Sequence, residues 1–251
     1  MLHFDDIVFG PIVSRRLGSS LGVNLLPSKG KLCNFDCVYC ECGWNKDGVS
    51  DGRFPSLEEV EYALNARIPR LAAEGVRIDS ITFSGNGEPT LNPDFPEIID
   101  AVIRLRDEYF PSAKVSVLSN ATMLHRKPVL DALKKVDNPI MKIDASSDRI
   151  ISMINKPRGS YSLDDVLAQL EGFNGNFILQ TMFLQSPQFE ISEQEIEDWR
   201  NIVRRLRPKG VMVYTIDRET PDSSLSKCTM DRMKTITAPL VEEGFDVSIS
   251  G

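Results

Sequence analysis

Several features that are common in secreted, membrane and nucleic-acid-binding proteins are scarce in this sequence of 251 residues. No apolar run approaches the roughly 20 residues that a bilayer-spanning helix needs, and the first residues lack the basic and then apolar pattern of a secretory signal. The formal net charge of −7 argues against a large non-specific nucleic-acid surface, although it leaves room for a local basic patch. No repeat, low-complexity tract or linker divides the chain. We therefore expect one cytoplasmic domain over residues 1–251, without a membrane segment.

Side chains that bind metals are also few, with two histidines and five cysteines. Four of the cysteines lie in one stretch, where Cys33, Cys37 and Cys40 have the spacing C-x3-C-x2-C and Cys42 follows. Clustered thiols without secretory features indicate a metal site in a reducing compartment, not a disulfide framework. Outside this stretch the chain offers three further candidate ligands: Cys228, His3 and His125.

The number of ligands separates two kinds of metal site. A zinc loop of this type usually pairs two cysteines with two distant Cys or His residues, and the remaining candidates do not form such a pair. Three thiolates without a fourth suit a 4Fe–4S cluster in which one iron stays open for a substrate. A structural zinc loop, or thiols without a metal, is the alternative.

Beyond this loop, which we place at residues 30–45, segments typical of strands and helices alternate. Such alternation predicts a parallel sheet covered by helices, and six or seven units are too few for a complete eight-unit barrel. The expected fold is therefore α/β, a partial (β/α)6 TIM-like barrel. Strands are expected at 21–26, 78–83, 114–118, 140–144, 177–184, 211–216 and 246–250. Helices are expected at 56–73, from Asn92, at 126–136, from Ser162, from Ser192 and at about 230–243, with capping boxes at Ser56 and Ser192.

In parallel β/α folds, ligand-binding groups gather at the C-terminal ends of the strands. The second strand of the pattern ends in Ser84-Gly-Asn-Gly-Glu-Pro-Thr90, where glycines let backbone approach a ligand and Glu88 offers a carboxylate to an ammonium group. Polar residues follow or lie in later strands, with helix capping and ordinary structural pairing as the competing interpretations. They are Ser119, Asn120, Lys142, Asp144, Gln180 and Thr181. Arg15 and Arg16, in a turn-rich stretch before the first strand, suit either an anion or a solvated turn.

The cysteine spacing, with the aromatic Tyr39 directly before Cys40, resembles the C-x3-C-x-aromatic-C signature of radical S-adenosylmethionine (SAM) enzymes. The Gly85-to-Pro89 turn resembles the Gly-Gly-Glu-Pro motif of that family, here with Asn86 between the glycines. The resemblance implies a partial barrel, one 4Fe–4S cluster and bound SAM. It implies Cys33, Cys37 and Cys40 as metal ligands, and Tyr39, Gly85, Asn86, Gly87, Glu88, Ser119, Asn120 and Asp144 as cofactor-binding residues.

The chemistry implied by this resemblance is reductive cleavage of SAM to methionine and a 5′-deoxyadenosyl radical, which abstracts a hydrogen atom from a substrate. It implies an external low-potential electron donor of the flavodoxin or ferredoxin type. Because Cys42 and Cys228 complete no second C-x3-C-x2-C set, we expect a single cluster.

Three segments, 9–18, 84–90 and 154–157, resemble small iron–sulfur oxidoreductases related to the tRNA wyosine-forming enzymes. Wyosine synthase itself uses a second cluster on upstream cysteines and a lysine that engages pyruvate, whereas this chain has no cysteine before Cys33. Lys142 and Lys156 are candidates for an amine role or for salt bridges. Three hypotheses stay open: a radical enzyme acting on a small molecule or modified nucleotide, an activating enzyme that makes a glycyl radical on a partner protein, and a non-catalytic iron–sulfur or zinc module.

Overall fold

The computed structural model describes residues 4–14, 16–47 and 52–251. The strands are β1 (Val8–Ser14), β2 (Gly18–Val23), β3 (Ser80–Phe83), β4 (Lys114–Ser119), β5 (Asn138–Lys142), β6 (Ile178–Met182), β7 (Leu184–Gln185), β8 (Gly210–Tyr214), β9 (Ser226–Lys227) and β10 (Val247–Ser250). The helices are α1 (Leu57–Ala73), α2 (Phe95–Tyr109), α3 (Lys127–Leu133), α4 (Asp148–Ile154), α5 (Leu163–Glu171), α6 (Glu193–Leu206) and α7 (Met230–Glu242), with a short 3-10 helix η1 at Pro89–Leu91. Within the described ranges, none of these helices combines the length and apolar character that crossing a membrane requires.

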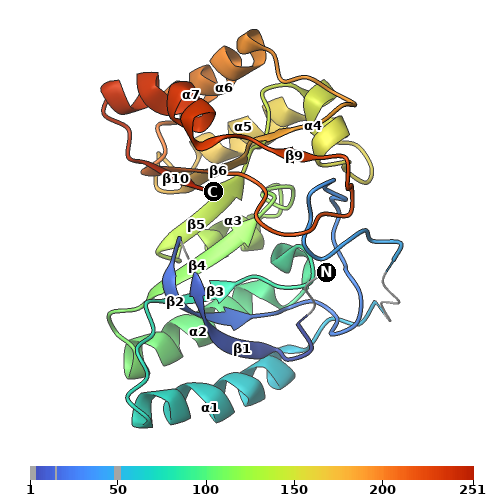
Figure 1. Ribbon diagram of the computed structural model, residues 1–251. Helices are drawn as coiled ribbons and strands as arrows, with labels where there is room; N and C mark the ends of the chain where they lie inside the picture. Colours follow the sequence, from blue (N-terminus) through green and yellow to red (C-terminus); the bar gives the residue numbers. More distant parts are fainter. Residues whose placement is uncertain (1–3, 15, 48–51) are drawn as a thin grey trace.

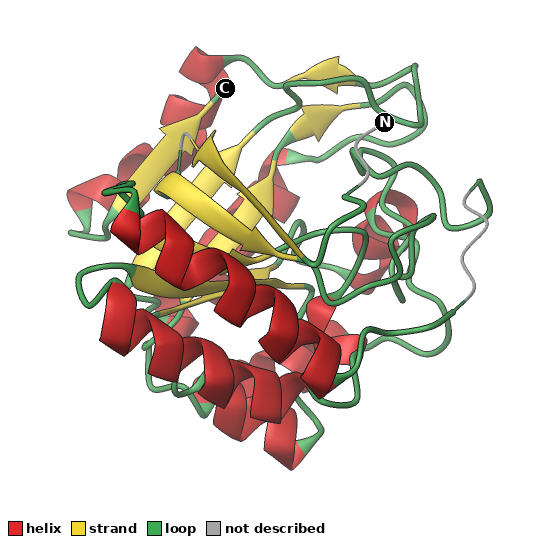
Figure 2. Cartoon of the chain, turned by 90° about the horizontal axis from the view of Figure 1, so that it is seen from below, coloured by secondary structure: helices red, strands yellow, loops and turns green. Residues whose placement is uncertain are grey.

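Eight strands form one curled sheet in the order β1-β2-β3-β4-β5-β6-β8-β10. Strand β1 pairs with β2 in antiparallel fashion, and the other pairs in this sheet are parallel. The sheet remains open between its two edges, and helices cover its outer face (Figures 1 and 2). The predicted partial barrel is confirmed, and the predicted last strand is β10, which pairs with β8.

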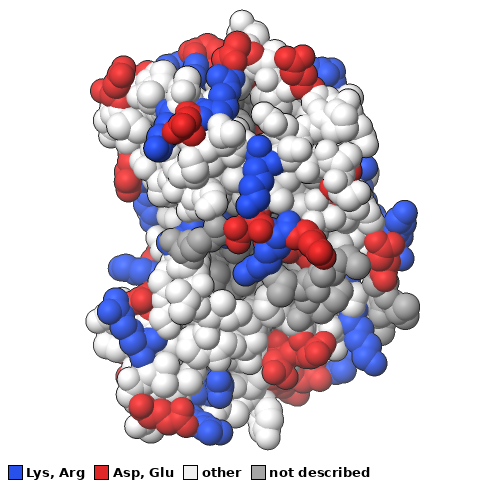
Figure 3. Space-filling view, in the orientation of Figure 1, with Lys and Arg blue, Asp and Glu red and all other residues white. Residues whose placement is uncertain are grey.

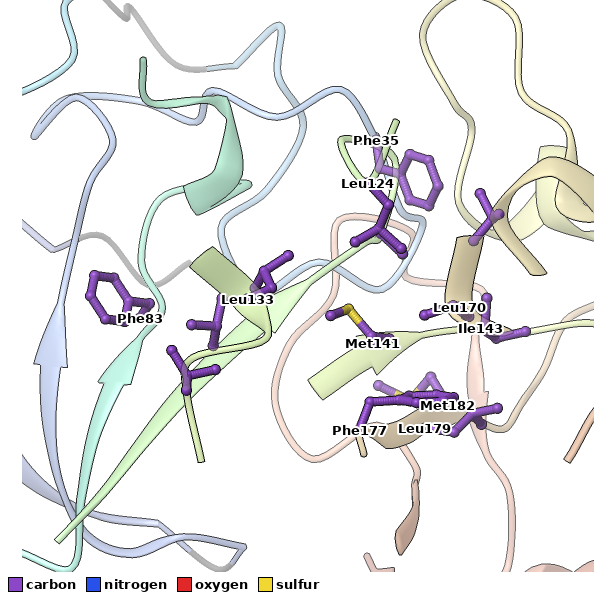
Figure 4. Packing of buried hydrophobic residues seen from close by; sticks show 14 of the residues in the cluster. Phe35, Phe83, Leu124, Leu133, Met141, Ile143, Leu170, Phe177, Leu179 and Met182 are labelled. Atoms are coloured by element: carbon purple, nitrogen blue, oxygen red, sulfur yellow. The ribbon is translucent and has the colours of Figure 1, made fainter. Parts of the chain in front are cut away.

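The core lies between the sheet and its helices, because the strands consist largely of branched apolar residues. Figure 4 shows buried side chains that separate elements contribute to this cluster, among them Phe83, Leu133 and Met141. The polar Thr181 is also fully buried, and its hydroxyl donates to Ile143 O at 2.7 Å while it accepts from Trp199 Nε1 at 2.9 Å. Thr181 therefore faces the helical layer, whereas its neighbour Gln180 faces the inside of the barrel.

Two predicted helix starts differ in detail from the structure. Helix α2 begins at Phe95 after its N-cap Asp94, so Asn92 lies two residues too early to cap it. The Asn92 side chain instead accepts from Asp94 N at 2.9 Å and donates to Leu25 O and Pro55 O, which ties two loops together. Ser192 caps α6 as predicted. The Glu195 carboxylate, however, accepts from Ser146 N and Ser147 Oγ. The capping box at Ser56 is confirmed in both directions.

The sequence pattern missed three features: strand β1, helix α4 and the small antiparallel sheet of β7 and β9. Strand β1 was assigned to turns because it contains Gly10-Pro11, a pair that usually breaks regular structure. The structure accommodates the proline on an edge strand, where the register with β2 shifts between Phe9 and Ile12. Helix α4 has seven residues and β7 and β9 have two each, which is too short for a periodic signal.

Candidate functional site

The cysteine-bearing loop is held against two other segments by backbone hydrogen bonds. Leu32 forms a parallel bridge with Gly87, in which Leu32 N donates to Asn86 O at 2.8 Å and Glu88 N donates to Leu32 O at 3.3 Å. On its other side, Val38 N donates to Ile154 O at 2.8 Å. The loop is thereby fixed between the turn that follows β3 and the end of α4, which brings the second and third resembling segments together.

The glycines of the turn after β3 are required by close approach of the backbone. Gly85 has φ +156° and Gly87 has φ +146°, and a Cβ on Gly87 would lie 1.8 Å from Leu32 O. A Cβ on Gly85 would lie 2.2 Å from the Asn24 side-chain oxygen. Only glycine fits these positions without moving the cysteine loop or its support.

Nine of the predicted site residues line a cavity of about 200 Å³ at the C-terminal ends of the strands, which we call the cysteine cavity. They are Cys33, Cys37, Cys40, Tyr39, Gly85, Gly87, Glu88, Ser119 and Asn120. Two predicted residues do not line it. Asn86 turns away, with its amide nitrogen donating to Phe4 O and Pro27 O. Asp144 lies behind Tyr39, whose hydroxyl donates to it.

The Glu88 carboxylate is buried and already accepts four hydrogen bonds. One oxygen accepts from Thr90 N, Thr90 Oγ1 and Ser119 Oγ, and the other accepts from Asn120 N at 2.7 Å. Burial raises the pKa of Glu88 despite these bonds. Glu88 therefore joins the ends of β3 and β4, and it has one remaining acceptor position, on Oε2, for a ligand.

The sulfur atoms have nitrogen donors and a buried cation around them. Asn155 Nδ2 lies 3.3 Å from Cys37 Sγ, and Phe35 N lies 3.4 Å from Cys33 Sγ. Lys31, whose side chain is 1% exposed, donates to Asp36 at 3.2 Å, and nearby thiolates and Asp36 raise its pKa although burial alone would lower it. A positive charge and N–H donors stabilise thiolates and tune the potential of an iron–sulfur cluster.

Without a metal, Cys33 and Cys37 favour their protonated form, whereas a hydrogen bond from Cys42 and the charge of Lys31 lower the pKa of Cys40 to about 6. Burial raises the pKa of Cys33, and it raises the pKa of Cys37 to about 11. Metal binding at these positions would therefore release protons. Within the described ranges, no three or more His, Cys, Asp or Glu side chains are placed to share one metal ion.

A buried polar network lies beside Cys37. The Asp144 carboxylate accepts from Tyr39 Oη, from Asn155 Nδ2 at 2.6 Å and from Met182 N at 2.9 Å. Lys142 Nζ donates to Tyr39 Oη at 2.6 Å and lies 3.7 Å from the carboxylate. Nearby groups, of which Asp144 contributes most, raise the pKa of Lys142 and outweigh the opposite effect of burial. Asp144 therefore positions Tyr39, which lines the cavity, and Asn155, which contacts Cys37 Sγ.

Asn155 and Lys31 were not singled out from the sequence as site residues. Asn155 lies in the resembling segment 154–157, and Lys31 lies two positions before Cys33, so proximity to a motif was the available signal. Gln180 was considered, and its Nε2 is the one buried side-chain nitrogen or oxygen among the described residues without a hydrogen-bond partner. It lines the cysteine cavity.

The other candidates from the sequence lie at different places. Cys42 lines the cysteine cavity, and its Sγ lies 3.4 Å from Gly85 O, to which the thiol donates. The Cys40 sulfur is also within hydrogen-bonding reach of Cys42. Cys228 lines a separate cavity, beside the segment that follows β6. Lys156 is exposed, with Nζ 4.7 Å from the centre of the Trp44 ring. Arg15 lies outside the described residues.

Three closely spaced cysteines at the strand ends of an open half-barrel are typical of one class of iron–sulfur enzymes. Comparison with known proteins identifies that class. The sequence matches the radical SAM superfamily over residues 28–211. Because this match covers more than half of the chain, the protein belongs to the radical SAM superfamily.

Among relatives, a UPF0026 protein of Methanocaldococcus jannaschii is 32% identical over 83% of this chain and 63% of its own length. The chain therefore spans less than two thirds of that relative. A radical SAM methyltransferase from Sphaerobacter thermophilus superimposes with a TM-score of 0.68 at 16% identity, over 92% of this chain and 65% of that one. TYW1 with a lysine-pyruvate adduct superimposes with a TM-score of 0.63 at 15% identity, over 92% of this chain and 76% of that one. At these identities the two structures show a shared fold.

The protein is accordingly an enzyme of the radical SAM class, whose members bind a 4Fe–4S cluster and SAM. Enzymes of this class generally need an external reductant. The face in Figure 3 carries acidic and basic side chains interspersed, without one large basic surface.

Proposed function

We propose that this protein binds one 4Fe–4S cluster through Cys33, Cys37 and Cys40 and reductively cleaves SAM to abstract a hydrogen atom from a substrate. The observation that carries the proposal is the bridge between Leu32 and Gly87, because it brings the three thiols and the glycine turn to one cavity. The donor set fits the cluster, since three thiolates leave one iron free. When bound, the cluster supplies the electron for cleavage and an iron that binds the cofactor.

Different residues around the cysteine cavity would stabilise the thiolates and bind the cofactor. Lys31 and the amide of Asn155 stabilise the thiolates against the low dielectric of the buried loop. Gly85 O and the remaining position on Glu88 Oε2 are acceptors for the cofactor ammonium, and the Gln180 amide is a free donor for one of its oxygens. Tyr39, held by Asp144 and Lys142, forms a rigid wall of the cavity.

The test is anaerobic reconstitution with iron and sulfide, followed by dithionite and SAM, with 5′-deoxyadenosine and methionine as the measured products. Cys37→Ala should lose cluster absorbance and product formation. Cys228→Ala is the matched control, because this buried cysteine lines a different cavity, and it should retain both. Equal loss in the two variants, or tight zinc binding without cleavage by the wild type, would contradict the proposal and favour a structural zinc module.

We expect about four iron atoms per chain, as one cluster requires, and about eight would show that a second cluster is present. We propose a flavodoxin or ferredoxin as the electron donor and a reducing cytoplasm as the compartment, since clustered free thiols persist there. The substrate of the proposed enzyme is a small molecule or a modified nucleotide. An activating enzyme would instead produce a glycyl radical on a partner protein, detectable by electron paramagnetic resonance.

A further inference from the structure

A second cavity of about 400 Å³ adjoins the cysteine cavity, and we call it the seam cavity because it lies between β2 and the ends of β8 and β10. The two cavities share wall residues, including Cys40, Cys42, Gly85 and Tyr214. The volume is in the range of small-molecule sites. A molecule in the seam cavity would therefore lie next to the proposed site of radical formation.

Arg16 lies in the turn between β1 and β2 and lines both cavities. The Ser14 hydroxyl accepts from Arg16 N at 3.3 Å and from Leu17 N at 3.2 Å, which holds the backbone of this turn. The guanidinium carbon lies 4.7 Å from the centre of the Tyr214 ring, at the end of β8. Arg16 thus reaches across the open side of the half-barrel, from the second strand of the sheet order to the seventh.

This contact leaves the hydrogen-bonding edge of Arg16 available. A guanidinium that stacks on an aromatic ring uses its face, whereas its N–H donors point outward in the plane. Among the described side chains, Arg16 has no carboxylate partner. Tyr214 is itself held by Lys142, whose Nζ donates to its hydroxyl at 3.2 Å, so the stacking surface is fixed in position.

A second arginine in the same cavity shows the opposite arrangement. Arg218 Nη1 lies 2.5 Å from Glu41 Oε2, so its charge is neutralised within the protein. The rest of the wall is polar as well as apolar, with the hydroxyls of Ser20 and Thr82 joined by a 2.7 Å hydrogen bond. Among its described side chains, the cavity therefore offers one arginine, Arg16, whose N–H donors are not paired with a carboxylate.

We propose that the substrate of this enzyme carries an oxyanion, a phosphate or a carboxylate, which the Arg16 guanidinium binds in the seam cavity. The proposal rests on the proposed function, because the cavity is a substrate site only if radical chemistry takes place beside it. A planar guanidinium matches the two oxygens of such a group with two parallel N–H bonds. The oxyanion could otherwise come from the carboxylate of SAM itself, and the experiment separates these sources.

The experiment is calorimetric titration of the anaerobically reconstituted protein with inorganic phosphate and with acetate, each with and without saturating SAM. The wild type should bind at least one anion, with similar affinity whether or not SAM is present. Arg16→Gln should weaken that binding by about tenfold or more, as expected for a lost charge-assisted pair. Arg218→Gln, which changes an arginine already paired with Glu41, should change it by less than about twofold.

Arg16→Lys keeps the charge but loses the planar fork, so it should bind several times more weakly than the wild type, and it carries the test if Arg16→Gln does not fold. Preference for phosphate or for acetate would assign the oxyanion. Absence of binding in the wild type, equal weakening in the Arg16 and Arg218 variants, or displacement of the anion by SAM would each overturn the proposal. Because anion binding needs no turnover, failure of SAM cleavage by the wild type would instead refute the proposed function.

Discussion

Replacing Gly87 by alanine tests whether the cysteine loop is positioned by the turn after β3. The new Cβ would lie 1.8 Å from Leu32 O, so the Leu32–Gly87 bridge must separate. Its two hydrogen bonds are together worth about 1–3 kcal/mol. The φ of +146° adds strain of about 1–3 kcal/mol for a residue with a side chain. Together these terms predict a loss of about 2–6 kcal/mol in the free energy of unfolding, which at about 2–4 °C per kcal/mol lowers Tm by at least about 4 °C.

Gly75→Ala is the matched control for the strain alone. Gly75 also has positive φ, +68°, but nothing lies within 4 Å of the position that its Cβ would occupy. Alanine there should reduce stability by about 1 kcal/mol, which corresponds to about 2–4 °C. Both variants are compared as apoproteins by thermal unfolding, and then by iron content after anaerobic reconstitution.

Thermal unfolding and iron content together test whether the Leu32–Gly87 bridge positions the cysteine loop. Gly87→Ala should bind less iron than the wild type, because the loop that bears Cys33 must move with Leu32. Gly75→Ala should bind as much iron as the wild type, since it lies after α1, away from the loop. If Gly87→Ala unfolds within about 2 °C of Gly75→Ala and binds iron normally, the bridge does not position the loop and the reasoning is wrong.

Two further predictions concern the scaffold. Asp137 accepts from Arg106 at 2.6 Å and from Val115 N at 2.9 Å, and these bonds outweigh burial and lower its pKa. Because the folded-state pKa is depressed, the stabilisation is present above the ordinary aspartate range and is lost as pH falls through the lower value. Asp137→Asn should therefore cost about 1–3 kcal/mol at pH 7 and progressively less in acid urea titrations, whereas exposed Asp131→Asn should change stability by under about 0.5 kcal/mol at either pH. Thr181→Val should cost about 2 kcal/mol or more in urea unfolding, because it leaves a buried indole N–H unpaired; an unchanged midpoint would contradict the hydrogen bond.

The parts of the fold that could be predicted from the sequence depend on local regularities. Alternating apolar segments and caps such as Ser56 predict parallel strands with helices outside, and the strand ends then predict where the site lies. Strands at the edge of the sheet are harder to predict from the sequence. The sequence pattern cannot show that Gly10-Pro11 lies on an edge strand, where proline's missing N–H leaves no hydrogen bond of the sheet unmade. Short elements such as α4 contain too few turns for a period to appear.

The roles of individual side chains in the site depend on partners far away in the chain, which spacing does not reveal. Glu88 has the right type and position to bind an ammonium group, yet most of its acceptor positions are used by residues 2 and 31–32 positions away. Asn86 lies in the middle of the motif, yet its side chain fastens the N-terminal segment 82 positions away. Residue type predicted which groups can bind a ligand, and only the fold shows which of them are still available.

The glycines of the turn after β3 matter both for the fold and for the site. They were interpreted from the sequence as places where backbone approaches a cofactor, and the structure gives each a neighbour within the protein, Asn24 for Gly85 and Leu32 for Gly87. A turn that accepts the cysteine loop this closely also sets the distance between the thiols and the Gly85 carbonyl. The requirement for glycine there is thus structural in its immediate cause and functional in its consequence, so substitutions in this turn should disturb metal content and stability together.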